Sequence, residues 1–305
     1  MTLFRIGTRG SRLALWQANY VAERLRPLAA PRAVELVEIV TAGDQVRDAP
    51  LPAIGGEGVF TKEIQRALLA GEVDVAVHSL KDLPTVPVEG LVLAAVPARW
   101  PAGDVLVSHR HRTFDALPPG ALVATSSLRR RAQALHRRPD LRLVHIRGNV
   151  ETRLRKLREQ DLDALILAQA GLERLGLGGA VTEVLDRSWM LPAVGQGALA
   201  LECRHDDRAA LDLLSALDDR PTRQAVLAER ELLRALGGGC QVPIGAETSV
   251  TGETLRLRGA VLSPDGTQRI EAELTAPIAD AEMLGRQLAQ ELLQQGAREI
   301  LSSRD

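Results

Sequence analysis

The chain has 305 residues, of which 45% are hydrophobic, so it is long enough to bury a large core in two or three compact units. Its formal charge of -1 excludes a protein that is basic or acidic throughout, yet the segment 128–158 contains eleven Arg and Lys against two acidic residues. Three Trp, one Tyr and three Phe are too few rings for a surface that stacks nucleic-acid bases. If this segment binds a partner, a small polyanion is expected rather than nucleic acid. On charge alone, however, the favoured interpretation is a solvated helix face.

The first hundred residues alternate short apolar runs with amphipathic helical segments. We expect strands at 3–7, 34–40 and 73–77 and helices at 11–25 and 59–69. This alternation is typical of βαβ units on a parallel sheet.

After the Pro-rich segment PARWPAG the same alternation begins again. The expected strands lie near Asp104, Leu122, Leu141 and Ala164, and helices begin near Ser126 and Asn149. The segments IGTRGSRLALWQA and VATSSLRRRAQAL both run from a strand through Thr and Ser into a helix, so that Thr8 corresponds to Thr125. The first two lobes are therefore expected to be alike, with a ligand-binding cleft between them at the carboxyl ends of their strands.

From Arg220 the pattern changes to a long helix, a glycine loop, three strand-like runs and a helix at 279–294. We therefore expect an α/β protein with two doubly wound lobes like those of periplasmic binding proteins, and a smaller α+β domain with an antiparallel three-stranded sheet. The expected domains are 1–97 joined to 198–216, then 103–192, and finally 220–305.

Polar residues follow the expected strands where ligands bind in such sheets. The loop HSLKDLP offers His78, Ser79, Lys81 and Asp82 at a strand end, and only three Lys stand among 35 Arg in the chain. A solvated turn is an equal alternative. Four arginines lie at or near helix starts, where carboxylates are their natural partners: Arg129, Arg130, Arg147 and Arg153. Five others are expected to be solvated: Arg131, Arg137, Arg138, Arg155 and Arg158.

The two cysteines, Cys203 and Cys240, show no metal or disulfide spacing, which favours a reducing compartment. Cys203 is expected in a buried strand. Cys240 follows three glycines in GGGCQVPIG and is a reachable thiol, although a buried inert cysteine is favoured on this feature alone. Neither a signal peptide nor a membrane-spanning stretch is recognised, so we expect a cytoplasmic protein without a membrane partner.

Seven segments, in this order, resemble the porphobilinogen deaminase family: TRGSRLALWQ, GGEGVFTKE, VHSLKDLP, TSSLRR, RGNVETRL, LPAVGQGALALECR and GGGCQVPIG. The resemblance implies a dipyrromethane cofactor bound by a thioether to Cys240. On this primer, four porphobilinogens are joined head to tail with loss of ammonia, and hydrolysis releases hydroxymethylbilane. It also implies that no metal is needed and that the chain is a monomer.

The resemblance assigns roles to particular residues. Asp82 matches the catalytic aspartate. The cofactor would be bound by Lys81, Ser127, Arg129, Arg130 and Arg147, and the substrate by Arg9, Ser11, Arg153, Arg174 and Gln196. Each pyrrole carries two carboxylates, and two charges 4 Å apart repel by about 1 kcal/mol even in water, so the basic segment becomes a requirement rather than a solvated face.

Two residues depart from the family pattern, since Glu57 stands where many relatives have a lysine and Ala53 where some have a basic residue. Both lie in a segment that the resemblance implies is a lid contacting the substrate, and both leave Asp82 and Cys240 unchanged. The rival hypothesis is a non-catalytic two-lobed protein that binds small anions. The third domain with its cysteine favours the enzyme.

Overall fold

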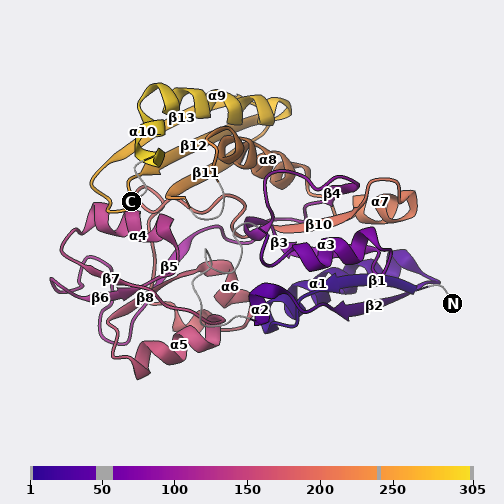
Figure 1. Ribbon diagram of the computed structural model, residues 1–305, viewed down its shortest axis with the longest axis horizontal. Coiled ribbons are helices and arrows are strands. Elements are labelled where there is room, and N and C mark those ends of the chain that lie inside the picture. Colours follow the sequence, from indigo (N-terminus) through magenta and orange to yellow (C-terminus); the bar gives the residue numbers. More distant parts are fainter. Residues whose placement is uncertain (1–2, 46–57, 239–241, 303–305) are drawn as a thin grey trace. The chain divides into compact units, whose positions relative to one another are not determined.

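The structure is a computed structural model that describes residues 3–45, 58–238 and 242–302 (Figure 1). The chain divides into two compact units. Unit 1 comprises Met1–Trp100 and Ala198–Arg223, and unit 2 comprises Pro101–Gly197 and Gln224–Asp305. Each unit is built around its own sheets.

The sheet of unit 1 has the order β2-β1-β3-β10-β4. Its strands are β1 (Leu3–Thr8), β2 (Ala33–Glu38), β3 (Val75–Ser79), β4 (Leu91–Ala95) and β10 (Leu199–Arg204). The expected parallel pairing is confirmed for β1 with β2 and with β3. The sheet is nevertheless mixed, because β10 lies antiparallel between β3 and β4. The parallel strands β1, β2 and β3 follow one another in the chain and are joined by long crossover connections. β10 is not part of this series, because it enters the sheet from a remote part of the chain.

Helices cover both faces of this sheet. The helices are α1 (Arg12–Ala29), α2 (Ala42–Gln45), α3 (Lys62–Leu69) and α7 (Arg208–Ser215), and a 3₁₀ turn, η2, spans Leu80–Asp82. Alternate residues of β3 face opposite cores: Val75 and Val77 pack with α1 and α7, whereas Ala76 packs with α3. The helix positions thus follow from the side-chain alternation along each strand.

The α/β sheet of unit 2 has the order β7-β6-β8-β5-β9. Its strands are β5 (Asp104–Val107), β6 (Leu122–Ala124), β7 (Arg142–Val144), β8 (Ala164–Ala168) and β9 (Glu183–Val184). The helices are α4 (Leu128–Arg137), α5 (Val150–Glu159) and α6 (Gln169–Arg174), and η3 spans Gly178–Ala180. α4 packs on one face, and α5 and α6 pack on the other.

The two α/β sheets have equivalent topology. β6 takes the place of β1, β7 of β2 and β8 of β3, while β5 corresponds to the antiparallel β10. Thr8 ends β1 and Thr125 follows β6, as the sequence correspondence predicts. The expected start of α4 at Ser126 lies one residue early, because Ser127 is the residue whose side chain caps the helix. Two other expected helix bounds also differ, since α1 continues to Ala29 and α3 begins at Lys62.

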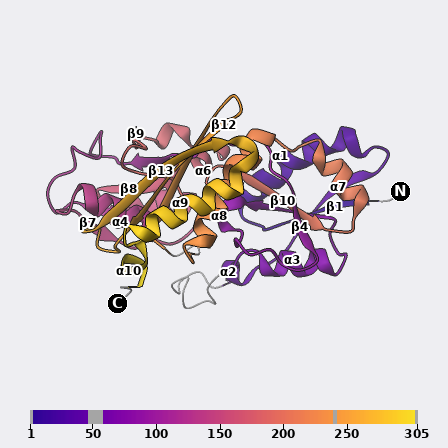
Figure 2. The same ribbon diagram turned by 90° about the horizontal axis from the view of Figure 1, so that it is seen from above.

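The last part of unit 2 is an antiparallel sheet of β11 (Ile244–Thr251), β12 (Thr254–Leu262) and β13 (Arg269–Pro277). Figure 2 shows α9 (Ala281–Gln294) lying along this sheet. The remaining elements are α8 (Arg220–Ala235), η4 (Ile278–Asp280) and α10 (Ala297–Ser302). Gly285 lets α9 approach α8, because a Cβ there would clash with the Ala228 carbonyl oxygen.

The expected fold class, two α/β lobes with a small antiparallel C-terminal domain, is confirmed. The boundaries of the three expected domains stay a prediction. Among the helices of the described ranges, none is long and apolar enough to cross a membrane.

Candidate functional site

A pocket in unit 1 collects polar residues from the ends of two neighbouring parallel strands. Arg9 and Ser11 lie in the turn after β1, His78 and Ser79 end β3, and Asp82 lies in η2. The lining is completed by Leu13, Ala14, Gln17, Phe60, Thr61 and Val77. This is where ligands bind in open α/β sheets, and the structure brings together the predicted residues Arg9, Ser11 and Asp82.

Three contacts fix the polar groups of this pocket. The Ser11 hydroxyl accepts a hydrogen bond from the Ala14 amide (3.3 Å) and so caps α1. The buried Gln17 amide donates to Ser79 Oγ at 2.8 Å. The Arg9 guanidinium lies 4.1 Å from the centre of the Phe60 ring, a cation–π contact that positions its charge on the pocket wall. An anionic ligand would thus meet a cation beside a helix N-terminus.

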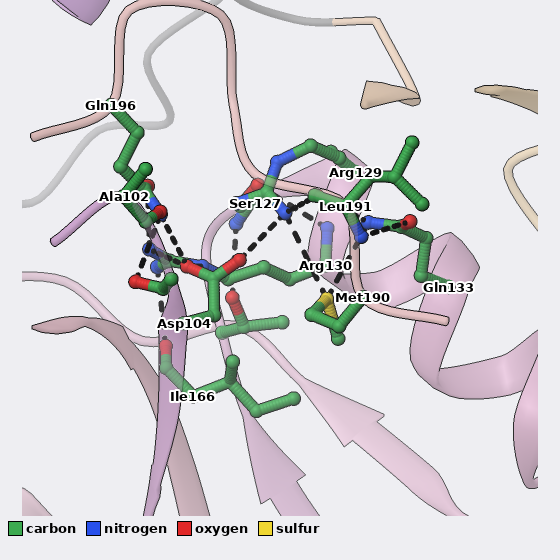
Figure 3. Close-up of polar contacts among 12 residues, drawn as sticks. Ala102, Asp104, Ser127, Arg129, Arg130, Gln133, Ile166, Met190, Leu191 and Gln196 are labelled. Carbon is green, nitrogen blue, oxygen red and sulfur yellow. Dashed lines mark hydrogen bonds and ion pairs between the residues drawn. The ribbon is translucent and has the colours of Figure 1, made fainter. Parts of the chain in front are cut away.

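Asp104, at the start of β5, is a fully buried carboxylate at the centre of a polar cluster in unit 2 (Figure 3). Its Oδ2 lies 2.7 Å from Arg129 Nη1, and its Oδ1 accepts from Arg130 Nε and from the Gln196 amide, both at 2.9 Å. Burial raises the pKa of Asp104, but the two guanidiniums and the amide outweigh it and lower the pKa to about 2. The carboxylate is therefore ionised at neutral pH.

The two arginines also bind backbone carbonyls. Arg130 donates to Ile166 O, and Arg129 donates to Leu191 O, which also accepts from the Gln133 amide. Arg129 and Arg130 are only 3% and 6% exposed. Burial lowers the pKa of Arg129, although Asp104 opposes this shift. The carboxylate partner expected for these arginines is thus, in this structure, a residue of the protein.

Sequence reasoning missed Asp104. The available signal was an acidic residue directly before the apolar run VLV, a position at which an unpaired charge would be costly to bury. Arg174 and Gln196 were predicted as substrate contacts. Arg174 Nη2 donates to Gly197 O at 2.7 Å, and the Gln196 amide also donates to Ala102 O. Both side chains are buried.

A second cationic group lies around the start of α5. Asn149 caps the helix by accepting from the Thr152 amide, and Arg153 Nε donates to Gly148 O at 2.8 Å. Lys156 Nζ donates to Arg147 O, and Arg147 and Arg153 are half-buried. Burial and the charges of Arg147, Arg153 and Lys156 lower the pKa of His145. Burial is the larger cause of this shift, and the three nearby cations act in the same direction.

The arginines farther along these helices lie at the surface. The exposed ones are Arg131, Arg137, Arg155 and Arg158, and Arg138 is half-buried and paired with Asp140. Their expected solvation is confirmed except for Arg138.

Three sequence predictions concern residues outside the described ranges: Cys240, Glu57 and Ala53. Lys81 is described, lies in η2 beside Asp82 and is half-buried. Ser127 caps α4 by accepting from the Arg130 amide.

Cys203 lies in β10 and is fully buried, as the sequence predicts. Burial, with Asp207 and Glu202 nearby, raises the pKa of its thiol to about 11. In a Cys240→Ser variant, we expect Cys203 to resist iodoacetamide at neutral pH, because little thiolate forms and the sulfur is covered. Intact mass after timed exposure measures this, with guanidinium-unfolded protein as the positive control. Rapid alkylation of the folded variant would contradict the assignment.

Two family models match the chain. The porphobilinogen deaminase, dipyromethane cofactor binding domain matches residues 4–212, and the porphobilinogen deaminase, C-terminal domain matches 223–294. A porphobilinogen deaminase of Syntrophotalea carbinolica is 52% identical and covers 99% of this chain and 96% of its own. That of Pelotomaculum thermopropionicum is 52% identical, with 97% and 95% covered. Among solved structures, the periplasmic VFT2 domain of Bordetella pertussis BvgS is 15% identical with a TM-score of 0.41, covering 70% of this chain and 85% of that one. By its two family models and its relatives, the chain belongs to the porphobilinogen deaminase family.

Proposed function

We propose that this protein is a hydroxymethylbilane synthase, a transferase of tetrapyrrole biosynthesis. It condenses four porphobilinogen molecules head to tail on a dipyrromethane primer, releases one ammonia per addition, and frees hydroxymethylbilane by hydrolysis. The observation that carries this proposal is the 52% identity to a porphobilinogen deaminase over 99% of the chain. The unit 1 pocket supports it, since Asp82 and Arg9 line the same cavity.

The residues of unit 2 suit the carboxylates of a dipyrromethane. Arg129 Nε is buried and has no hydrogen-bond partner among the residues that the structure describes, so a donor is left for an acceptor from outside the chain. We propose that Ser127, Arg129, Arg130 and Arg147, with Lys81 of unit 1, bind the cofactor, and that Cys240 carries it by a thioether. When bound, the cofactor supplies the free pyrrole α-carbon to which the first substrate is joined.

Asp82 is proposed as the catalytic residue. A carboxylate in this pocket accepts hydrogen bonds from pyrrole N–H groups, stabilises the cation that forms as ammonia leaves, and takes up the proton released from the α-carbon. Arg9 and Ser11 would bind the acetate and propionate of the substrate. Arg153 would do the same in unit 2. Arg174 and Gln196 are also proposed as substrate contacts, and any such contact replaces part of their present bonding with Gly197 and Asp104.

The oligomeric state, the cellular location and the domain boundaries complete the proposal. We propose that the enzyme acts as a monomer in the cytoplasm, with porphobilinogen as its small-molecule substrate and no nucleic-acid partner. We also propose three domains with the boundaries given from the sequence. The three sheets of the described residues support this division, although the second and third sheets share unit 2.

Replacing Arg147 with Ala tests the proposed carboxylate site. We expect protein that lacks the primer or that stalls, so that intact masses after addition of porphobilinogen end at an early pyrrole unit. Arg155→Ala is the matched control, since Arg155 lies on α5, which begins three residues after Arg147, but is exposed and paired with Glu159. The control should give the complete series. A complete series and an unchanged KM in Arg147→Ala would show that Arg147 does not bind these carboxylates.

A further inference from the structure

Beneath the unit 1 pocket lies a buried cluster of three polar side chains. His78 on β3, Glu202 on β10 and Gln65 on α3 are 5%, 4% and 5% exposed. β3 and β10 are antiparallel neighbours in which His78 pairs with Ala200 and Ala76 with Glu202, so both side chains leave the same face of the sheet. α3 covers this face, which brings Gln65 to the pair.

The contacts within this cluster fix the carboxylate. The Gln65 amide nitrogen lies 3.2 Å from Glu202 Oε1 and 3.1 Å from Oε2. His78 Nε2 lies 3.3 Å from Glu202 Oε2, and within the described ranges this nitrogen has no partner beyond that ion pair. A buried carboxylate facing an imidazole nitrogen holds a proton on that nitrogen and fixes the tautomer. The other ring nitrogen, Nδ1, is then the basic one.

His78 also lines the pocket that contains Asp82. We propose that His78 is a second proton-handling group of this pocket, and that Glu202 and Gln65 are the positioning residues that set its tautomer and its basicity. The inference rests on the proposed function and names a residue that the assignment of Asp82 leaves out.

The proton balance of the proposed reaction gives His78 its task. Porphobilinogen enters as an ammonium ion, and its carbon–nitrogen bond breaks with the electron pair leaving on ammonia. A carbon–carbon bond then forms to the pyrrole α-carbon, and that carbon loses its proton while its C–H electron pair restores the ring. This proton must then be transferred to ammonia, which leaves as ammonium. Asp82 takes this proton from the carbon, His78 receives it on Nδ1 and returns it to ammonia, and Glu202 balances the imidazolium charge in between.

The charged groups around His78 determine the sign of the expected pH effect. β10 presents Glu202, η2 presents Asp82, and the turn after β1 presents Arg9. The uncharged Gln65 of α3 and Thr61, directly before α3, complete the surroundings. Glu202 lies directly against the ring. Removing its charge should therefore destabilise the imidazolium that forms when His78 holds the proton.

The test compares kcat as a function of pH for the wild-type enzyme, Glu202→Gln and His205→Gln. His205 is the matched control, because it is an exposed histidine directly after β10. We expect Glu202→Gln to lower kcat roughly 10-fold at neutral pH and to move the acidic limb of the profile to lower pH. His205→Gln should leave the profile unchanged. A Glu202→Gln enzyme with reduced activity but an unmoved profile would show a purely structural cluster and overturn the inference.

A measurement on the wild-type protein is independent of how the variant folds. The ¹⁵N chemical shifts of histidine rings distinguish the two tautomers, and His78 can be assigned by through-bond correlation. We expect the proton on Nε2 when the ring is neutral. A neutral ring with its proton on Nδ1 would overturn the inference. If wild-type protein consumes no porphobilinogen, the proposed function fails instead, and this outcome is separate from an unmoved pH profile.

Discussion

Replacing Asp82 with Asn is expected to lower kcat by roughly 10² or more while KM changes much less. The amide keeps the shape of the side chain but removes the negative charge, which matters most when the pyrrole becomes cationic. The substrate carboxylates would still meet Arg9 and Ser11 in the same pocket, so binding should persist. Steady-state kinetics on enzyme supplied with preformed primer measures both constants and separates catalysis from primer assembly.

The control for this experiment is Asp212→Asn, an exposed aspartate on α7 of the same unit. It should behave as the wild type. If Asp82→Asn keeps a near-normal kcat, Asp82 has no part in catalysis. If it loses only affinity, Asp82 is a binding residue.

The second large effect is expected for Asp104→Asn. This change leaves the guanidiniums of Arg129 and Arg130 buried without their carboxylate, and breaking a buried ion pair in this way costs about 3–5 kcal/mol of the free energy of unfolding. Folding lowers the pKa of Asp104 to about 2, so the contribution of this carboxylate is present above its ordinary pKa and is lost as the pH falls through about 2. At neutral pH, the difference in the free energy of unfolding between the wild type and Asp104→Asn should therefore have its full value.

Urea unfolding at neutral pH measures this effect, with Asp115→Asn as the control. Asp115 also pairs with an arginine of α4, Arg137, but that pair is exposed and its loss should barely change stability. The Asp104→Asn protein should also be purified without its primer, because Arg129 and Arg130 would no longer be held in place. Equal, small changes in stability for both variants would contradict the role given to Asp104.

Local patterns predicted most of the elements. Apolar runs such as the one that forms β3 marked the strands, and Ser11 and Asn149 marked helix starts because their side chains accept from backbone amides in the first turn. The error at α4 has a local cause as well. Thr125, Ser126 and Ser127 are consecutive residues that can all cap a helix, and the sequence does not indicate which of them takes the extended conformation.

The contacts that define the sites depend on pairing between distant segments. Glu202 of β10 contacts Gln65 of α3 although the two residues are 137 positions apart, and no local pattern indicates that β10 lies beside β3. Asp104 meets Arg129 only because β5 lies next to β8 and α4 packs on the same sheet. The residue types at both sites were visible in the sequence, but the internal partners of Arg129, Arg130 and His78 were not.

The measurement that tests the account most directly is the intact mass of the purified protein, with and without porphobilinogen. The wild-type protein should exceed its sequence mass by one dipyrromethane and gain pyrrole units in discrete steps with substrate, and Cys203→Ser should do the same. Cys240→Ser should show neither the primer nor the steps. A wild-type protein at its unmodified sequence mass that gains no pyrrole units, or an adduct that persists in Cys240→Ser, would contradict the account.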